Sequence, residues 1–317
     1  MRPDAFAAVM ATGIVSVAVA GHGFRGLGDI LLVLVAGLLP VLILAVAIAW
    51  RRHRWRLRDL GVVLPLFTFV AANAVLATRL AGHRIAVGTL TVAALAAWLA
   101  LVPIAARQMW RCGGADLRDQ ARGGWELASV ATSGVAILLA EQRMVVQAVA
   151  FWTVAIGFYV LMTSLIGWRV WHEADVSVLV PPDAWILMGA LAIATLAGAH
   201  IHHHTQGWAA ADIRWVTAGT WAVATGWIPV LMFIALRHLR RLAALGAGAW
   251  WWAMVFPLGM YSVATQALAT ETGWSPLRAV SWAFCWVALL GWLSLASGVL
   301  ARTIGHWWSN SRREASA

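Results

Sequence analysis

The sequence contains few charged residues and no lysine. Charged side chains make up 11% of its 317 residues, whereas 62% of the residues are hydrophobic. A soluble domain carries about 25% charged residues, so there is too little polar surface here to coat a water-soluble globule. The net charge of +10 comes from 23 arginines. Because they fall in short segments between apolar runs, membrane topology explains them better than nucleic-acid binding does.

The chain also lacks the usual marks of an enzyme. Of its two cysteines, Cys112 follows an arginine-rich stretch and Cys285 lies within an apolar run, so no disulfide is expected between them. There is no glycine-rich phosphate loop, no CxxC pair and no nucleophile elbow. The first apolar run lacks a charged leader followed by a cleavage site, and we expect a retained helix there. The sequence therefore predicts neither an enzyme nor a bound cofactor.

Apolar runs near 20 residues long recur along the chain, which is the length that a helix needs to cross a bilayer. None shows the roughly ten-residue alternation of a transmembrane strand. The runs lie at residues 5–20, 27–50, 61–80, 85–109, 124–140, 144–170, 182–201, 215–236, 250–265 and 276–304. The sequence predicts an all-α polytopic membrane protein with ten transmembrane helices. Residues 1–308 would form this single domain and residues 309–317 a short polar cytoplasmic tail.

The arginines are distributed unequally between the two sides of this topology. If the N-terminus lies inside the cell, six arginines fall outside and the other 17 fall inside. The six are Arg25, Arg79, Arg84, Arg143, Arg214 and Arg278. The positive-inside rule then predicts a plasma-membrane protein with both termini in the cytoplasm.

The odd-numbered runs differ in composition from the even-numbered ones. The odd runs hold more Gly, Ser, Thr and Asn, whereas the second and fourth are mostly Leu, Val, Ala and Ile. Lipid-facing helices can be uniformly aliphatic, and helices packed inside favour small and hydroxylated residues. We therefore expect five helical hairpins, with the odd helices inside and the even ones outside, around a central pore. Tight packing by small residues without any pore is the alternative.

No run carries Asp, Glu, Arg or His near its centre. Such groups usually mark proton relays and coupled pumps, so their absence favours passive movement of a solute. Hydroxyls, an amide and helix ends would then stabilise an anion. The candidate pore-lining residues are Ser16, Thr68, Asn73, Ser129, Thr132, Ser133, Thr195, Ser262 and Thr265. For any one of them, a hydrogen bond within its own helix is the more ordinary role.

The ninth run carries Phe256 and Pro257 near its middle. Proline cannot donate to the carbonyl of Ala253 and its ring crowds that turn, so a kink is expected there. A kinked helix can place the ring of Phe256 in a central pathway. From these residues alone, a proline kink packed by an ordinary Phe is the favoured interpretation, because prolines are common in transmembrane helices.

A histidine run lies at the end of the seventh apolar run, from His200 to His204. His200 and His204 are four residues apart, so both can face one side of a helix and share a metal. No acidic partner or HExxH pattern accompanies them, and polar capping of the helix end is favoured. A membrane-embedded metal-binding protein or enzyme built on this cluster is the alternative function.

Two motifs resemble one known family. The N-terminal PDAFAAVMATG, from Pro3 to Gly13, and the FPLGMYSVAT segment that starts at Phe256 are similar to the tellurite-resistance/dicarboxylate transporter family. That family includes bacterial TehA, fungal malate permeases and plant slow anion channels.

The resemblance implies ten helices around a pore, plugged by a phenylalanine at the position of Phe256, in each subunit of a homotrimer. It implies small anions as solutes, including chloride, nitrate and C4-dicarboxylates such as malate. The lipid bilayer is the other expected partner, and no nucleic acid is expected. A structural membrane subunit without transport remains a third interpretation.

Overall fold

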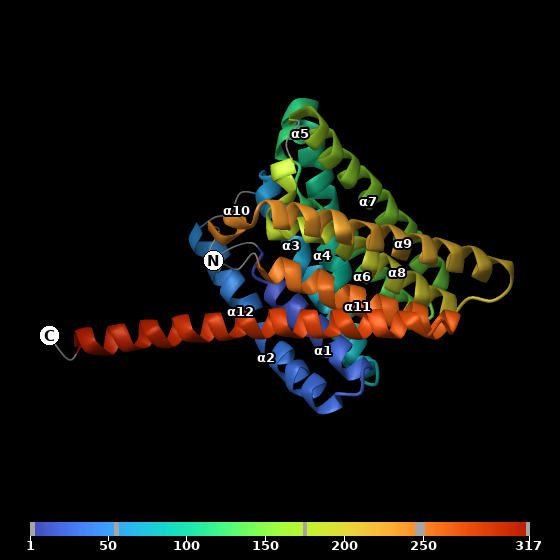
Figure 1. Ribbon diagram of the computed structural model, residues 1–317, viewed down its shortest axis with the longest axis horizontal. Coiled ribbons are helices and arrows are strands. Elements are labelled where there is room, and N and C mark those ends of the chain that lie inside the picture. Colours follow the sequence, from blue (N-terminus) through green and yellow to red (C-terminus); the bar gives the residue numbers. More distant parts are fainter. Residues whose placement is uncertain (1–3, 54–56, 174–175, 245–250, 315–317) are drawn as a thin grey trace.

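The computed structural model describes residues 4–53, 57–173, 176–244 and 251–314. Those residues form helices and turns without any strand, which confirms the predicted all-helical class (Figure 1). The described part of each predicted apolar run lies mainly in a helix. The long helices are α1 (Ala7–Gly21), α2 (Arg25–His53), α3 (Leu60–Arg79), α4 (Arg84–Arg111), α6 (Leu127–Glu141), α7 (Val145–Glu173), α8 (Ile186–His203), α9 (Trp208–Arg237), α11 (Trp252–Thr272) and α12 (Pro276–Glu314).

Eight of the described helical segments are long and apolar enough to cross a membrane. Two of the expected spans fall outside that group. Helix α1 is apolar but has only 15 residues, and α11 has 21 residues of more mixed composition. The structure thus supports a membrane protein with multiple apolar helices.

Several boundaries differ from the predicted ones. Short helices α5 (Gly114–Gln120) and α10 (Leu239–Ala244) were not predicted, and 3-10 turns at Val176–Leu179 (η2), Gly123–Glu126 (η1) and Pro182–Trp185 (η3) add to them. The last two lead directly into α6 and α8. Helix α12 continues to Glu314, so most of the expected tail is helical, and residues 315–317 lie outside the described part. The expected start of the ninth run, Trp250, also lies outside it, and α11 extends to Thr272.

Five helices form a closed ring inside the molecule. Helix α1 contacts α3, α3 contacts α6, α6 contacts α8, α8 contacts α11, and α11 returns to α1. The apolar stretches of α3, α6 and α8 are 72%, 94% and 94% buried, whereas those of α2, α4, α7, α9 and α12 are between 11% and 28% buried. Each inner helix packs against the outer helix that follows it in the chain. The odd-inside, even-outside arrangement expected from composition is therefore present.

Glycines allow the inner helices to approach closely at the middle of the ring. A methyl group on Gly13 of α1 would lie 2.9 Å from Val75 of α3, and one on Gly134 of α6 would lie 2.9 Å from Ala74 of α3. Likewise, Gly259 of α11 faces Ile14 of α1 at 2.9 Å. Small residues thus bring neighbouring backbones together, as is usual for helices packed within a membrane.

Tryptophans on four of the outer helices donate hydrogen bonds to the inner helix of the next hairpin. The indole nitrogen of Trp98 on α4 donates to Thr132 on α6 at 2.8 Å, and that of Trp152 on α7 donates to the carbonyl of Ala194 on α8 at 2.7 Å. Trp221 on α9 donates to Thr265 on α11 at 3.0 Å. Trp292 on α12 donates to Thr12 on α1 at 2.9 Å and so joins the last hairpin to the first inner helix. These tryptophans have a structural role beyond the interface anchoring expected of them.

Candidate functional site

A cavity of about 450 Å³, here called the wide cavity, lies at one end of the ring. All five inner helices reach it with their N-terminal parts. The residues that line it include Ala7 and Met10 (α1), Leu64, Pro65 and Thr68 (α3), Gly124, Trp125 and Leu127 (η1 and α6), Pro182, Asp183 and Ile186 (η3 and α8), and Ala253 (α11). The inner helices are therefore parallel, and the positive ends of their dipoles converge on this cavity. Such an arrangement favours an anion.

The wide cavity also carries charged side chains of both signs, namely Arg122, Arg169, Asp4 and Asp183. Asp183 accepts a hydrogen bond of 3.2 Å from the backbone N–H of Gly124. This bond joins the start of α8 to the start of α6, so the two turns that form the cavity wall are held together.

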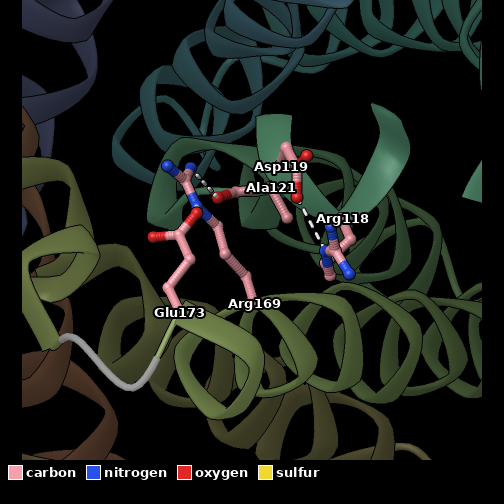
Figure 2. A network of polar contacts seen from close by, with 5 residues as sticks. All are labelled: Arg118, Asp119, Ala121, Arg169 and Glu173. Atoms are coloured by element: carbon pink, nitrogen blue, oxygen red, sulfur yellow. Dashed lines mark hydrogen bonds and ion pairs between the residues drawn. The ribbon is translucent and has the colours of Figure 1, made fainter. Parts of the chain in front are cut away.

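Figure 2 shows how Arg169 is held at this cavity. Its Nε lies 2.9 Å from Oε1 of Glu173, and one of its terminal nitrogens donates to the carbonyl of Ala121 at 2.9 Å. Nearby, Arg118 donates to Asp119 at 2.6 Å, and this bond lowers the pKa of the Asp119 carboxyl. Arg169 thus fixes the segment between α5 and η1 against α7, with its positive charge at the cavity wall.

A smaller cavity of about 170 Å³, here called the narrow cavity, lies within the same five helices towards their C-terminal ends. Its lining residues are Ile14, Val17, Ala74, Val75, Thr78, Ile137, Ile193, Leu196, His200, Met260 and Val263. Within this described lining, only His200 is titratable. The wall is otherwise apolar apart from the hydroxyl of Thr78.

A central layer separates the two cavities. It consists of the residues that lie along the inner helices between the two linings, among them Gly13, Gly189, Phe256 and Pro257. The side chain of Phe256 is fully buried. A methyl group on Gly189 would lie 2.9 Å from the ring of Pro257, so α8 and α11 touch directly at this level. Helix α11 continues through Pro257 without a break.

Most of the predicted pore-lining hydroxyls make hydrogen bonds to outer helices. Ser16 donates to the carbonyl of Gly28 on α2, Ser129 to that of Ala155 on α7, and Ser262 to that of Ser281 on α12. Each of these donors is buried and bonds to the outer helix of its own hairpin.

The threonines and Asn73 complete this set. Thr195 lies 2.9 Å from Thr220 on α9, and Thr132 and Thr265 accept from the tryptophans described above. Asn73 donates to the carbonyl of Phe69 in its own helix. Ser133 is buried, and no described group forms a hydrogen bond with its hydroxyl.

Among the nine candidates, Thr68 lines the wide cavity. Ser262 borders a further cavity of about 210 Å³, here called the end cavity, which shares Val17, Leu196 and Val263 with the narrow one. The structure therefore places these two candidates beside cavities and brings Ser16, Ser129, Thr132, Thr195 and Thr265 into hydrogen bonds between helices. Their contact with a solute remains a prediction.

Two histidines of the run contact different carboxylates. Nδ1 of His200 lies 2.5 Å from Oε1 of Glu141 on α6, and Nδ1 of His202 lies 3.4 Å from Oε1 of Glu271 on α11. Sequence analysis found no acidic partner because both carboxylates are distant in the chain. Across the described residues, no group of three or more His, Cys, Asp or Glu side chains is arranged to hold a metal ion. The metal-binding alternative thus gains no support.

Glu126 lies at the start of α6 and is completely buried. Its Oε1 accepts a 2.7 Å hydrogen bond from Thr163 on α7, and its Oε2 has no partner among the described groups. Sequence reasoning missed this burial, because a carboxyl next to Trp125 at a helix start is usually solvated.

Comparisons with known proteins identify the family of this chain. The family described as voltage-dependent anion channel matches residues 1–300. An uncharacterized membrane protein of Mycobacterium tuberculosis, present in two strains, is 33% identical over 132 residues, which cover 39% of this chain and 67% of that protein. The match to the family extends over nearly the whole chain, so the family resemblance predicted from the sequence is confirmed. This chain belongs to the voltage-dependent anion channel family.

Proposed function

We propose that the protein is an anion channel or uniporter that passes small anions down their gradient through the axis of the inner ring. The observation that carries this proposal is the pair of cavities enclosed by the same five helices and separated by the central layer around Phe256. Converging helix N-termini give the wide cavity the character of an anion entrance, and Arg122 and Arg169 offset the two aspartates of its lining.

In this proposal ten helices span the membrane. Helix α1, with 15 residues, is about 22 Å long, which is short for a bilayer core of about 30 Å. It lies within the ring and contacts α2, α3, α11 and α12, so its backbone is shielded from lipid. Helix α11, with 21 residues, is long enough to cross. Its mixed composition suits a helix that protein surrounds on all sides.

The arginine distribution orients the ring. With 17 arginines on the side of the N-terminus, both termini lie in the cytoplasm and the wide cavity faces it. The cytoplasmic end of the pathway would thus have the more positive potential and concentrate anions.

Phe256 is the proposed gate. Its ring belongs to the central layer, and an anion crossing that layer has to shed water against apolar surface, which costs several kcal/mol unless something compensates. A hydrophobic barrier of this kind would keep the pathway closed without any ion pair. Opening would require a change of the Phe256 rotamer or a small movement of α11 about Pro257.

The proposed substrate class rests on the family resemblance. Chloride, nitrate and C4-dicarboxylates such as malate are the proposed solutes, and Thr68 at the wide cavity is the predicted lining residue best placed to meet them. The remaining candidates, Ser16, Asn73, Ser129, Thr132, Ser133, Thr195, Ser262 and Thr265, would contribute when the helices move. A homotrimer with one pathway in each subunit is proposed on the same basis.

The test is flux from purified protein in liposomes across a panel of chloride, nitrate and malate. We expect anion-selective flux that exceeds leakage from protein-free liposomes and that rises in Phe256→Ala. Leakage rates indistinguishable from empty liposomes for every anion, in both wild type and Phe256→Ala, would leave a structural membrane subunit as the better description.

A further inference from the structure

The narrow cavity presents a difficulty for an anion. Because the five inner helices are parallel, this cavity lies towards their C-terminal ends, where free carbonyl groups carry partial negative charge. Its wall is formed mainly by aliphatic side chains such as Ile14, Ile193 and Leu196. An anion that has passed the central layer would meet an apolar wall and an unfavourable dipole, so a nearby cation would stabilise it there.

His200 is placed to supply that cation. It lines the narrow cavity, and its Nδ1 lies 2.5 Å from Oε1 of Glu141. A carboxylate at one ring nitrogen fixes the orientation of the ring. The bond uses Nδ1, which leaves Nε2 as the nitrogen available to a solute. Glu141 itself lines a neighbouring cavity of about 410 Å³, which shares Thr78 with the narrow one.

The other charged groups around the pair determine its net charge. Arg84 and Arg143 line the neighbouring cavity together with Glu141. His203, the last residue of α8, and His204, which follows it, also attract the Glu141 carboxylate. On α11, Glu271 pairs with His202 and also interacts with His200.

Two further groups complete these surroundings. At the start of α9, Arg214 interacts with Glu271, and Asp212 lies two residues before it in the chain. The surroundings of His200 thus contain charges of both signs.

His22 is the other histidine near this pathway. It lines the end cavity and its Nε2 lies 2.9 Å from the hydroxyl of Ser281. Burial lowers the pKa of His22, so this ring stays neutral to lower pH than an ordinary histidine. His200 differs from His22 in having a carboxylate partner, Glu141.

We propose that protonated His200, oriented by Glu141, forms a binding site for a small monovalent anion in the narrow cavity. Histidine is the side chain that ordinarily changes charge between pH 5 and 8, so the site would fill as the pH on that side falls. This inference rests on the proposed function, because it assumes that anions reach the cavity along the inner ring.

Direct binding provides a test that does not depend on flux. Thermal unfolding of the purified protein in detergent would be followed at pH 5.5 and pH 8, titrating sodium nitrate against sodium gluconate at constant ionic strength. We expect the apparent nitrate affinity to be about tenfold higher at pH 5.5, since a charge-assisted hydrogen bond from Nε2 forms only with the protonated ring. His200→Gln should abolish this difference.

Two more variants separate the site from its surroundings. His203→Gln changes an exposed histidine of the same run and should keep the full pH difference. Glu141→Gln keeps a hydrogen-bond acceptor for the ring but removes the charge, so the rise in affinity should move to lower pH. This second variant also tests the proposal if His200→Gln does not fold.

The outcomes are distinct from those of the flux measurement. The proposed site would be overturned if nitrate affinity were independent of pH, absent at both pH values or unchanged in His200→Gln. Flux through the wild type would still support the channel in that case. A pH-dependent affinity that His200→Gln removes, without flux in any variant, would support the site and contradict the channel.

Discussion

Pro257 of α11 packs directly on Gly189 of α8, where a methyl group would lie 2.9 Å from both Cβ and Cγ of the proline ring. This contact joins two inner helices at the level of Phe256, between the wide and narrow cavities. Since the proline ring is rigid, it cannot yield to an added side chain. The position of α11, and with it that of the Phe256 ring, therefore depends on residue 189 remaining without a side chain.

Gly189→Ala is expected to destabilise the protein by about 1–3 kcal/mol, because the added methyl group overpacks the contact with Pro257. The matched control is Gly226→Ala on α9, where no neighbouring atom lies within 4 Å. That variant should leave stability nearly unchanged or slightly raised, because alanine favours helix. Thermal unfolding of both variants in the same detergent provides the comparison. Equal midpoints would show that α8 and α11 adjust freely.

Phe256→Ala should raise chloride efflux from liposomes and leave folding nearly unchanged, and Phe256→Leu should be intermediate. The reason is that the ring is proposed to obstruct a pathway rather than to fill a packed core. If Phe256 is an ordinary core residue, its truncation leaves a void that costs about 3–5 kcal/mol. A lower thermal midpoint without greater efflux would therefore remove Phe256 as the gate.

Arg169→Gln should lower anion flux several-fold, because it removes a positive charge from the wall of the wide cavity and the ion pair with Glu173 (Figure 2). Arg118→Gln is the matched control. Arg118 pairs with Asp119 in the same region, but it is not among the residues that line the wide cavity. Flux at low and high ionic strength would show whether the effect is electrostatic, since salt screens it. A similar loss in both variants would contradict a role of the cavity charge.

Reporter fusions after Arg58 and after Arg241 should both indicate the cytoplasm. The expectation follows from the 17 arginines on the side of the N-terminus against six on the other. A fusion after Arg143, which follows α6, should give the opposite signal. A periplasmic signal after either Arg58 or Arg241 would overturn the proposed orientation.

Replacement of His202, His203 and His204 by alanine should leave transport at neutral pH largely intact. These side chains are assigned to the end of α8, and His203 is exposed. Metal content of the purified wild type and variant would be measured alongside flux. Loss of both bound metal and transport would revive the metal-binding alternative.

Composition alone identified the membrane class and separated inner from outer helices. The sequence predicted a buried role for the third, fifth and seventh apolar runs, because Gly, Ser and Thr are concentrated there, and the 72–94% burial of α3, α6 and α8 agrees. It also identified the family from the Phe256 segment and the N-terminal motif. These features are local: they depend on hydropathy, residue size and short motifs, each of which can be read within one helix.

Tertiary structure decided which polar groups meet. Thr132 accepts from Trp98, 34 positions earlier, and His200 pairs with Glu141, 59 positions earlier. Helical periodicity determines how side chains are spaced around one helix, but not the rotation of each hairpin about its axis. That rotation depends on close contacts such as Gly189 with Pro257, made between helices far apart in the chain. For this reason the cavities, the central layer and the partner of His200 could be identified only from the tertiary structure, in which the five inner helices contact one another.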